Sequence, residues 1–229
     1  MTPFRDTFWN VPRWAELLLY LTQGVGIAIL AARLYLRTRL WLKGQGGLPT
    51  DRVGRRLGRV LKYAVAQVRI ARERYSGIVH IALTAAFVAL FLGTVLATLD
   101  YYLGDLILNV RLLQGGFYLV YELALDFFAV VGVAALILAM LRRAIAHPAR
   151  LTYNAAFSAM LWILLADLLS GLLLESLRLA AVQPSWGPWS FAGYVLSRGV
   201  LALGLSAAAL STLHLVTWVF HFSLTGLIY

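Results

Sequence analysis

Apolar residues along this chain gather into five runs that are interrupted by short polar segments. Each run is long enough to cross the roughly 30 Å hydrocarbon layer of a bilayer as a helix. No ten-residue alternation of apolar and polar positions suggests a membrane barrel, and a lipid-embedded backbone must satisfy its own hydrogen bonds. We therefore predict one domain over residues 1–229, an all-α integral membrane bundle. The expected transmembrane helices are 14–36, 77–99, 117–141, 155–174 and 199–228, the last long enough to tilt or to project past the bilayer.

Basic residues are distributed unevenly between the loops. Residues 33–74 hold twelve Lys and Arg against two acids, and the loop after the third run adds Arg142, Arg143 and Arg150. Cytoplasmic loops of membrane proteins carry such an excess. We expect the N-terminus outside, both basic loops inside and the C-terminus in the cytoplasm, in a multi-pass protein of the inner (cytoplasmic) membrane.

The basic segment 51–74 also has a helical pattern of its own. Apolar residues recur at helical spacing, with arginines on the opposite side. Such an amphipathic helix either rests on anionic lipid or docks a cytoplasmic partner, and the two roles are compatible. We do not expect nucleic-acid binding, because membrane topology already explains the charge.

The composition limits the cofactors that the chain itself can hold. The chain is 61% hydrophobic and 13% charged, and it contains no cysteine. A typical soluble domain is roughly 25% charged. Without cysteine the chain cannot ligate an iron–sulfur cluster or attach a c-type haem covalently. Any cluster must sit on another polypeptide or on sequence beyond these residues.

Three of the four histidines, His80, His214 and His221, lie within the apolar runs. Ionisable residues in a membrane are costly and usually functional. His214 and His221 are seven residues apart and so share a helix face, and counting helical rise from the outer ends places His221 within a turn of His80. Two imidazoles from different helices can hold a haem iron axially, which suits electron transfer. The alternative is that neutral imidazoles only join helices. His147, in a basic loop, is interpreted as interfacial.

Three segments carry a family resemblance. "YSGIVHIALTAAFVALFLGTVLATLD" (75–100), "SGLLLESLRLA" (170–180) and "LHLVTWVFHF" (213–222) resemble helices of the nitrate reductase gamma / heterodisulfide reductase E (DsrM-like) membrane cytochrome b family. The resemblance implies five helices, one or two b-type haems, a membrane quinone such as menaquinone, and an iron–sulfur subunit or fused domain in the cytoplasm. It also implies that His80 and His221 are haem ligands.

The sequence departs from the family pattern at two places. Leu90 stands where nitrate reductase gamma subunits have a second ligand, and Tyr229 precedes the position of their last histidine. Either His221 is the outer-side ligand by alignment, or His80 and His221 hold a single haem, with His214 as the substitute ligand. We favour ligation by His80 and His221. The apolar end suggests a fragment of a longer chain that includes an iron–sulfur domain.

Acidic residues near the outer end of the third run are candidates for a quinone site. Glu122 and Asp126 are one turn apart and could accept protons from a quinol. The alternative is that they face the outer loops and pair with Arg111 or Arg178. Deeper in the membrane, Asp167 is expected to be protonated or paired with Ser170, and Glu175 to pair with Arg178.

The sequence therefore predicts an electron-transfer subunit that links a quinone pool to an iron–sulfur partner, and whether the chain has catalytic activity of its own stays open. One rival is a non-redox membrane anchor for a soluble subunit. The other is a proton or solute transporter that uses the buried acids, although the chain shows no internal repeat or broken-helix pair.

Overall fold

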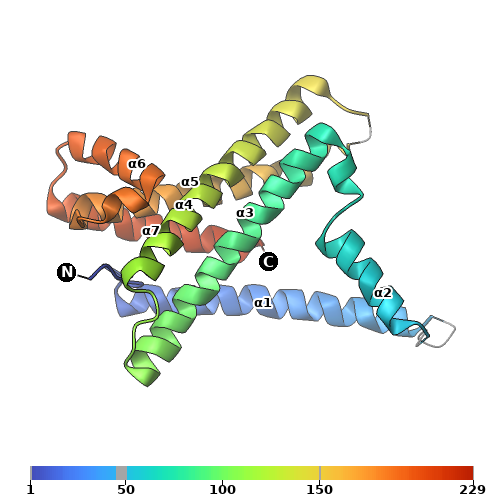
Figure 1. The fold of residues 1–229 in the computed structure, drawn as a ribbon, viewed down its shortest axis with the longest axis horizontal. Coiled ribbons are helices and arrows are strands. Elements are labelled where there is room, and N and C mark those ends of the chain that lie inside the picture. Colours follow the sequence, from blue (N-terminus) through green and yellow to red (C-terminus); the bar gives the residue numbers. More distant parts are fainter. Residues whose placement is uncertain (1, 45–50, 150, 229) are drawn as a thin grey trace.

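The computed structural model describes residues 2–44, 51–149 and 151–228, and this part of the chain is helical without a β-sheet. Five of its helices are long and apolar enough to cross a membrane, which confirms the predicted multi-pass helical fold. They are α1 (Arg13–Leu42), α3 (Arg74–Leu99), α4 (Gly115–Leu141), α5 (Ala155–Val182) and α7 (Ala207–Ile228) (Figure 1). The orientation of the termini stays a prediction.

Shorter elements join these helices. π-helical turns extend α3 through η3 (Asp100–Leu108) and α4 through η4 (Arg142–Ala146). A short helix α2 (Val53–Val60), a π-turn η1 (Leu61–Val65) and a 3-10 turn η2 (Ile70–Arg72) lead from α1 to α3. Between α5 and α7 lie the 3-10 turn η5 (Gly187–Trp189) and the helix α6 (Phe191–Ala202).

The last predicted span, 199–228, is two elements rather than one. α6 ends at Ala202, and the chain turns through Gly204, whose φ of +64° lies in the left-handed region that favours glycine. Ser206 then caps α7 by accepting a hydrogen bond from the amide of Ala209 at 3.2 Å. The break lies among apolar residues, so hydropathy alone did not reveal it.

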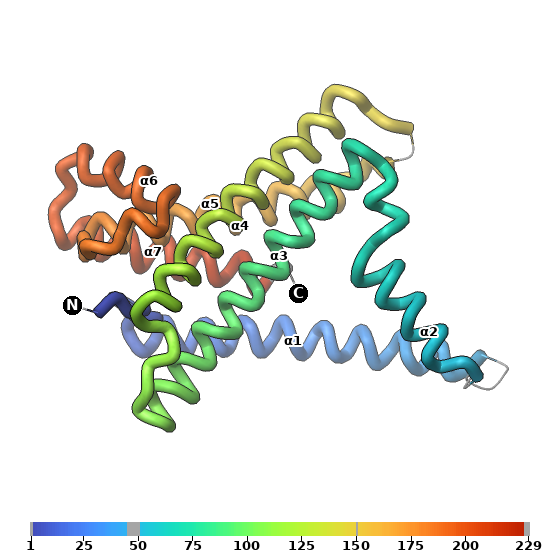
Figure 2. The backbone as a smooth tube through the Cα atoms, viewed as in Figure 1, coloured from blue at the N-terminus to red at the C-terminus, as the bar shows by residue number. Residues whose placement is uncertain are grey.

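Helix packing arranges the bundle as a chain of neighbours. α3 packs along α4, α4 on α5, and α5 on both α6 and α7, whereas α1 contacts mainly α7. Figure 2 shows α3 and α4 side by side and α1 running alone toward α2. Small residues allow close approach: a Cβ at Gly132 of α4 would lie 3.2 Å from the Cβ of Ala86 on α3. Such contacts drive association in lipid, where the hydrophobic effect between helices is absent.

The N-terminal segment, residues 2–12, connects the ends of several helices. The amide of Arg5 donates to the carbonyl of Leu113 at 3.2 Å, and the amide of Gly115 donates to the carbonyl of Pro3 at 2.8 Å. The side chain of Asn10 donates to the carbonyl of Ser211 at 2.7 Å. This segment therefore ties the start of α4 to the start of α7.

The basic segment 51–74 is not one continuous helix. It breaks after Ala66, where Gln67 adopts a left-handed φ of 50°. Every residue of α2 is exposed, including its three apolar and three arginine side chains. The apolar and basic faces that the sequence predicts are thus free for lipid or a partner over this first part of the segment.

Candidate functional site

His221 of α7 lies against α5. Its Nδ1 is 3.1 Å from the carbonyl oxygen of Asp167 and 3.1 Å from Oγ of Ser170. The neighbouring position on α5 is Gly171, where a Cβ would lie only 3.2 Å from Cε1 of the imidazole. The absence of a side chain at residue 171 is what allows the ring to lie so close to α5.

These contacts orient the imidazole of His221. The tautomer with its proton on Nδ1 would donate to the carbonyl of Asp167 and leave Nε2 for a ligand. Metal-binding histidines almost always donate their other ring N–H to a carbonyl or carboxylate in this way. The carboxylate Oδ1 of Asp167 is also 3.4 Å from Nδ1 but makes no hydrogen bond of its own. The expected partnership between Asp167 and Ser170 is present only through the backbone, because Ser170 donates to the carbonyl of Asp167.

His214 lies on α7 beneath the N-terminal segment. It is 3% exposed, and the ring of Trp9 meets its ring edge-on with centroids 4.6 Å apart. Its Nδ1 is buried and has no hydrogen-bond partner. A buried polar atom without a partner costs free energy, and an unpartnered nitrogen is one of the marks of a ligand-binding position.

His80 lies on α3 and is exposed. No hydrogen bond or ring contact joins it to His214 or His221 within the described chain, where α3 packs on α4 while α7 packs on α5 and α1. The structure therefore does not bring the proposed His80–His221 pair together, and the pairing stays a prediction. His147 is exposed in its loop and stacks on Tyr153 with ring centroids 4.3 Å apart.

The large aromatic residues near the histidines are placed differently on α3 and α7. Phe87 and Phe91 on α3 are stacked with ring centroids 6.4 Å apart, and both are exposed. Trp218 on α7 is buried instead and packs against Phe222 and Phe8. Trp218 thus has a packing role, whereas the face of α3 that carries the two phenylalanines is free for a planar apolar ligand.

The described histidines and acids do not gather into a polydentate metal site. Within residues 2–44, 51–149 and 151–228, no group of three or more His, Asp or Glu residues is placed to hold a metal. Zinc sites need three or four protein ligands, whereas a haem iron needs one or two axial ligands besides the macrocycle. His221, with one nitrogen anchored and the other unassigned, meets that need.

A buried polar cluster surrounds Glu122, and we define it as Arg5, Glu122, Glu175, Arg178 and Ser190. Glu122 lies 3.4 Å from a guanidinium nitrogen of Arg5 and 3.5 Å from one of Arg178, and it accepts a hydrogen bond from Ser190. Arg178 binds both carboxylate oxygens of Glu175, at 2.7 and 3.0 Å, as predicted. Burial would lower the pKa of Arg5, but electrostatic interactions with Tyr121 and Glu122 raise it above its ordinary value.

Asp126 joins α4 to α6. Its carboxylate accepts hydrogen bonds from the amides of Ala192 and Gly193, the second and third residues of α6. A carboxylate at a helix N-terminus satisfies orphan amides and the helix dipole. Both quinone candidates, Glu122 and Asp126, therefore have structural partners. Of the two arginines considered for them, Arg178 contacts Glu122, whereas Arg111 lies 4.0 Å from Asp105.

Two further buried acids were not singled out from the sequence. Glu16 of α1 pairs with Arg13 at 2.6 Å and accepts from the hydroxyl of Tyr102 at 3.1 Å. Asp100 accepts from the amides of Leu112 and Leu113 and so closes the loop before α4. The Arg13–Glu16 spacing of three residues was a usable signal, but the partners of Asp100 depend on a loop conformation that no local pattern encodes.

Comparisons with known proteins assign neither a family nor a function to the chain. No protein-family model matches the chain, and neither a curated protein nor a solved structure matches it. What the chain does must therefore be argued from its own histidines, acids and exposed faces.

Proposed function

We propose that this chain is a membrane cytochrome b subunit that passes electrons between a quinone and an iron–sulfur partner in the cytoplasm. The observation that carries the proposal is the orientation of His221, whose Nδ1 is engaged by Asp167 and Ser170. An imidazole used only to join helices needs no free nitrogen. An imidazole that serves as an axial haem ligand needs its other ring nitrogen, Nε2, to be free.

The chain's own residues would hold the cofactor from two helices. His221 is the ligand on α7, and His80, exposed on α3, is the second, with His214 as its substitute. A bound haem b supplies one-electron redox chemistry. Gly171 lets the His221 ring lie on α5, and Asp167 and Ser170 fix which nitrogen carries the proton.

For the quinone, we keep Glu122 ahead of Asp126 as the group that handles protons. Asp126 is held by two backbone amides, which cannot rearrange without unwinding the start of α6. Glu122 instead accepts from the hydroxyl of Ser190, which can rotate, and lies between two guanidinium groups. For the iron–sulfur partner, the exposed basic helix α2 is the docking surface we propose, in the inner membrane's cytoplasmic leaflet.

The test is spectroscopic. The purified chain is compared as wild type and as His80→Ala, His221→Ala and His147→Ala, by reduced-minus-oxidised absorption and by extraction of haem. We expect a b-type spectrum in the wild type and in the His147→Ala control, and its loss in both intramembrane variants. A colourless wild-type protein after expression with ample haem, or unchanged spectra in both variants, contradicts the proposal.

A second candidate function is a non-redox membrane anchor, and one observation favours it. The contacts of His221 with Asp167 and Ser170 cross from α7 to α5, so they also join two helices. Under this reading His221→Ala lowers the thermal stability of a protein that never binds haem. The haem extraction described above separates the two functions directly.

A further inference from the structure

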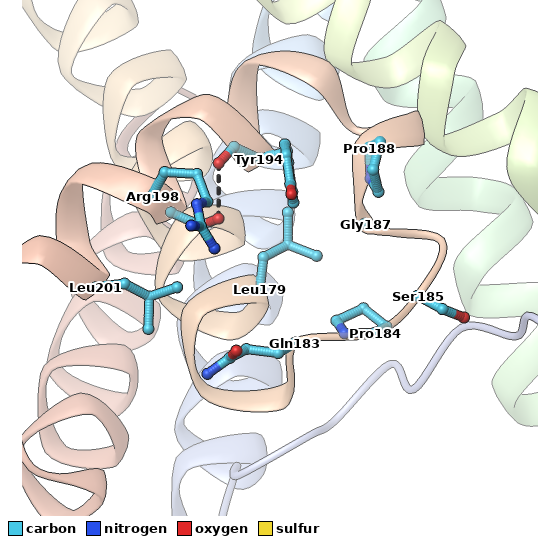
Figure 3. A pocket seen from close by; sticks show the side chains of 10 residues that line it. Leu179, Gln183, Pro184, Ser185, Gly187, Pro188, Tyr194, Arg198 and Leu201 are labelled. Atoms are coloured by element: carbon cyan, nitrogen blue, oxygen red, sulfur yellow. Dashed lines mark hydrogen bonds between the residues drawn. The ribbon is translucent and has the colours of Figure 1, made fainter.

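A pocket of about 200 Å³ lies where α5 ends and α6 packs back against it. Its walls come from the C-terminal turn of α5, the loop 183–190 and one face of α6. Figure 3 shows the guanidinium of Arg198 and the phenol oxygen of Tyr194 extending from α6 on one side, with Pro184 and Pro188 of the loop on the other. This pocket is separate from the histidines and from the polar cluster.

Two local features shape the pocket. Gln183 ends α5 in a left-handed conformation with φ of 46°, and its amide donates to the carbonyl of Leu179 at 2.9 Å. Gly187 allows the loop to approach the ring of Tyr194, because a Cβ there would lie 3.3 Å from Cδ2 of the ring. The floor is Leu179, and Ser197 is held within α6 by donating to the carbonyl of Tyr194 at 2.7 Å.

Several polar side chains of the pocket, most of them exposed, have no partner in the described part of the chain; Ser197 is the exception. Neither the guanidinium of Arg198 nor the hydroxyl of Tyr194 takes part in a hydrogen bond or ion pair with any described residue, and the same holds for the side chains of Gln183 and Ser185. Arg178, which immediately precedes the lining residue Leu179 on α5, is by contrast paired with Glu122 and Glu175. The pocket lining contains no acidic residue, and a guanidinium and a hydroxyl that line one space suit an anion.

The helix α6 beside the pocket indicates what kind of molecule carries that anion. α6 has twelve residues, about 18 Å of helix, so it is too short to cross a bilayer. It nevertheless exposes large apolar side chains beside Arg198: Val195 is 68% exposed, Leu196 47% and, just beyond the helix, Leu203 70%. A short apolar helix with one cation is typical of a segment that lies among lipid headgroups and acyl chains.

We propose that this pocket binds the phosphate headgroup of an anionic phospholipid, with Arg198 and Tyr194 as donors and the apolar face of α6 against an acyl chain. The pocket is smaller than the roughly 300–1,000 Å³ of most small-molecule sites, which suits a compact phosphate rather than a ring system. The lipid would stabilise the joint between α5 and α6. The proposal is independent of haem binding, so either can fail without the other.

The experiment measures lipid retention. The delipidated chain in detergent is titrated with short-chain phosphatidylglycerol, with phosphatidylcholine of the same chain length, or with inorganic phosphate, and bound species are counted by native mass spectrometry. The variants are Arg198→Gln, Tyr194→Phe and, as a control, Arg111→Gln, which removes a different exposed arginine. Thermal unfolding of each lipid-free variant checks that it is folded.

We expect phosphatidylglycerol to bind at least tenfold more tightly than phosphatidylcholine. Arg198→Gln should weaken it about tenfold, Tyr194→Phe should weaken it less, and Arg111→Gln should leave it unchanged. Equal binding of the two lipids, or an Arg198→Gln variant that retains phosphatidylglycerol like the wild type, overturns the proposal. Inorganic phosphate that binds as tightly as the lipid also overturns it, because the pocket would then be a site for a free anion.

Discussion

The polar cluster around Glu122 and the histidine face of α7 both bury ionisable side chains, but they satisfy them differently. In the polar cluster both carboxylates have donors: Glu122 contacts Arg5, Arg178 and Ser190, and Glu175 is bound by Arg178. On α7, Nδ1 of His214 has no hydrogen-bond partner, and on the facing helix α5 Oδ1 of Asp167 has none beyond its 3.4 Å approach to His221. The carboxylates of the polar cluster are thus more fully satisfied than the groups at the histidine face, although Nε of Arg5 in the cluster also has no hydrogen-bond partner.

The largest expected effect tests whether the polar cluster is structural. Arg178→Met keeps much of the side-chain volume but leaves Glu122 and Glu175 buried without their shared cation. Breaking a buried ion pair in this way costs about 3–5 kcal/mol. The measurement is thermal unfolding of the purified protein in detergent.

Arg111→Met is the control for this change, because Arg111 lies 4.0 Å from Asp105 at the surface. An exposed pair of this kind contributes about 0–1 kcal/mol. If Arg178→Met unfolds at the same temperature as Arg111→Met, the polar cluster does not stabilise the fold and the comparison fails.

A smaller effect is expected where His221 meets α5. Gly171→Ala introduces a methyl 3.2 Å from the imidazole, and overpacking of this kind costs about 1–3 kcal/mol. Because the ring is displaced from Asp167 and Ser170, any haem spectrum should change as well. Gly24→Ala on α1 is the matched control, since nothing lies within 4 Å of the added methyl. A Gly171→Ala protein as stable as the Gly24→Ala protein would show that His221 does not need the close approach.

The smallest effect concerns the capping of α6. Asp126→Ala removes the acceptor for the amides of Ala192 and Gly193, at a cost of about 0.5–2 kcal/mol for a lost helix cap. Hydrogen exchange at those two amides should quicken, while exchange in α3 stays as it was. Asp126→Asn keeps one oxygen acceptor and should fall between wild type and alanine. Unchanged hydrogen exchange in the Asp126→Ala variant would show that Asp126 does not stabilise the start of α6.

The helical membrane fold was readable from the sequence because each predicted span is long and mostly apolar and is separated from the next by a more polar segment. The Glu175–Arg178 pair was readable too, since residues three apart on a helix face one another. The break at Gly204 was not, because Leu203 and Leu205 keep the hydropathy high while one glycine reverses the chain. A positive φ is a property of one residue, whereas hydropathy averages over many.

The candidate site was readable in part. The presence of histidines in lipid could be read directly, and so could their spacing on α7. Counting helical rise placed His80 beside His221 by assuming straight, parallel helices, whereas α3 pairs with α4 and α7 with α5. The cap on α6 by Asp126 depends on a contact between residues 66 apart, which no local pattern predicts.

The spans differ in length by more than any bilayer can match at once. The apolar unit Arg74–Leu108 has 35 residues and Ala207–Gly226 has 20, which correspond to about 52 and 30 Å of helix. A hydrocarbon layer of about 30 Å matches the length of the shorter unit, Ala207–Gly226. The longer unit, Arg74–Leu108, must tilt in the hydrocarbon layer or extend into the headgroups. A change in acyl-chain length therefore affects the tilt of the two helices unequally and alters the angle between them.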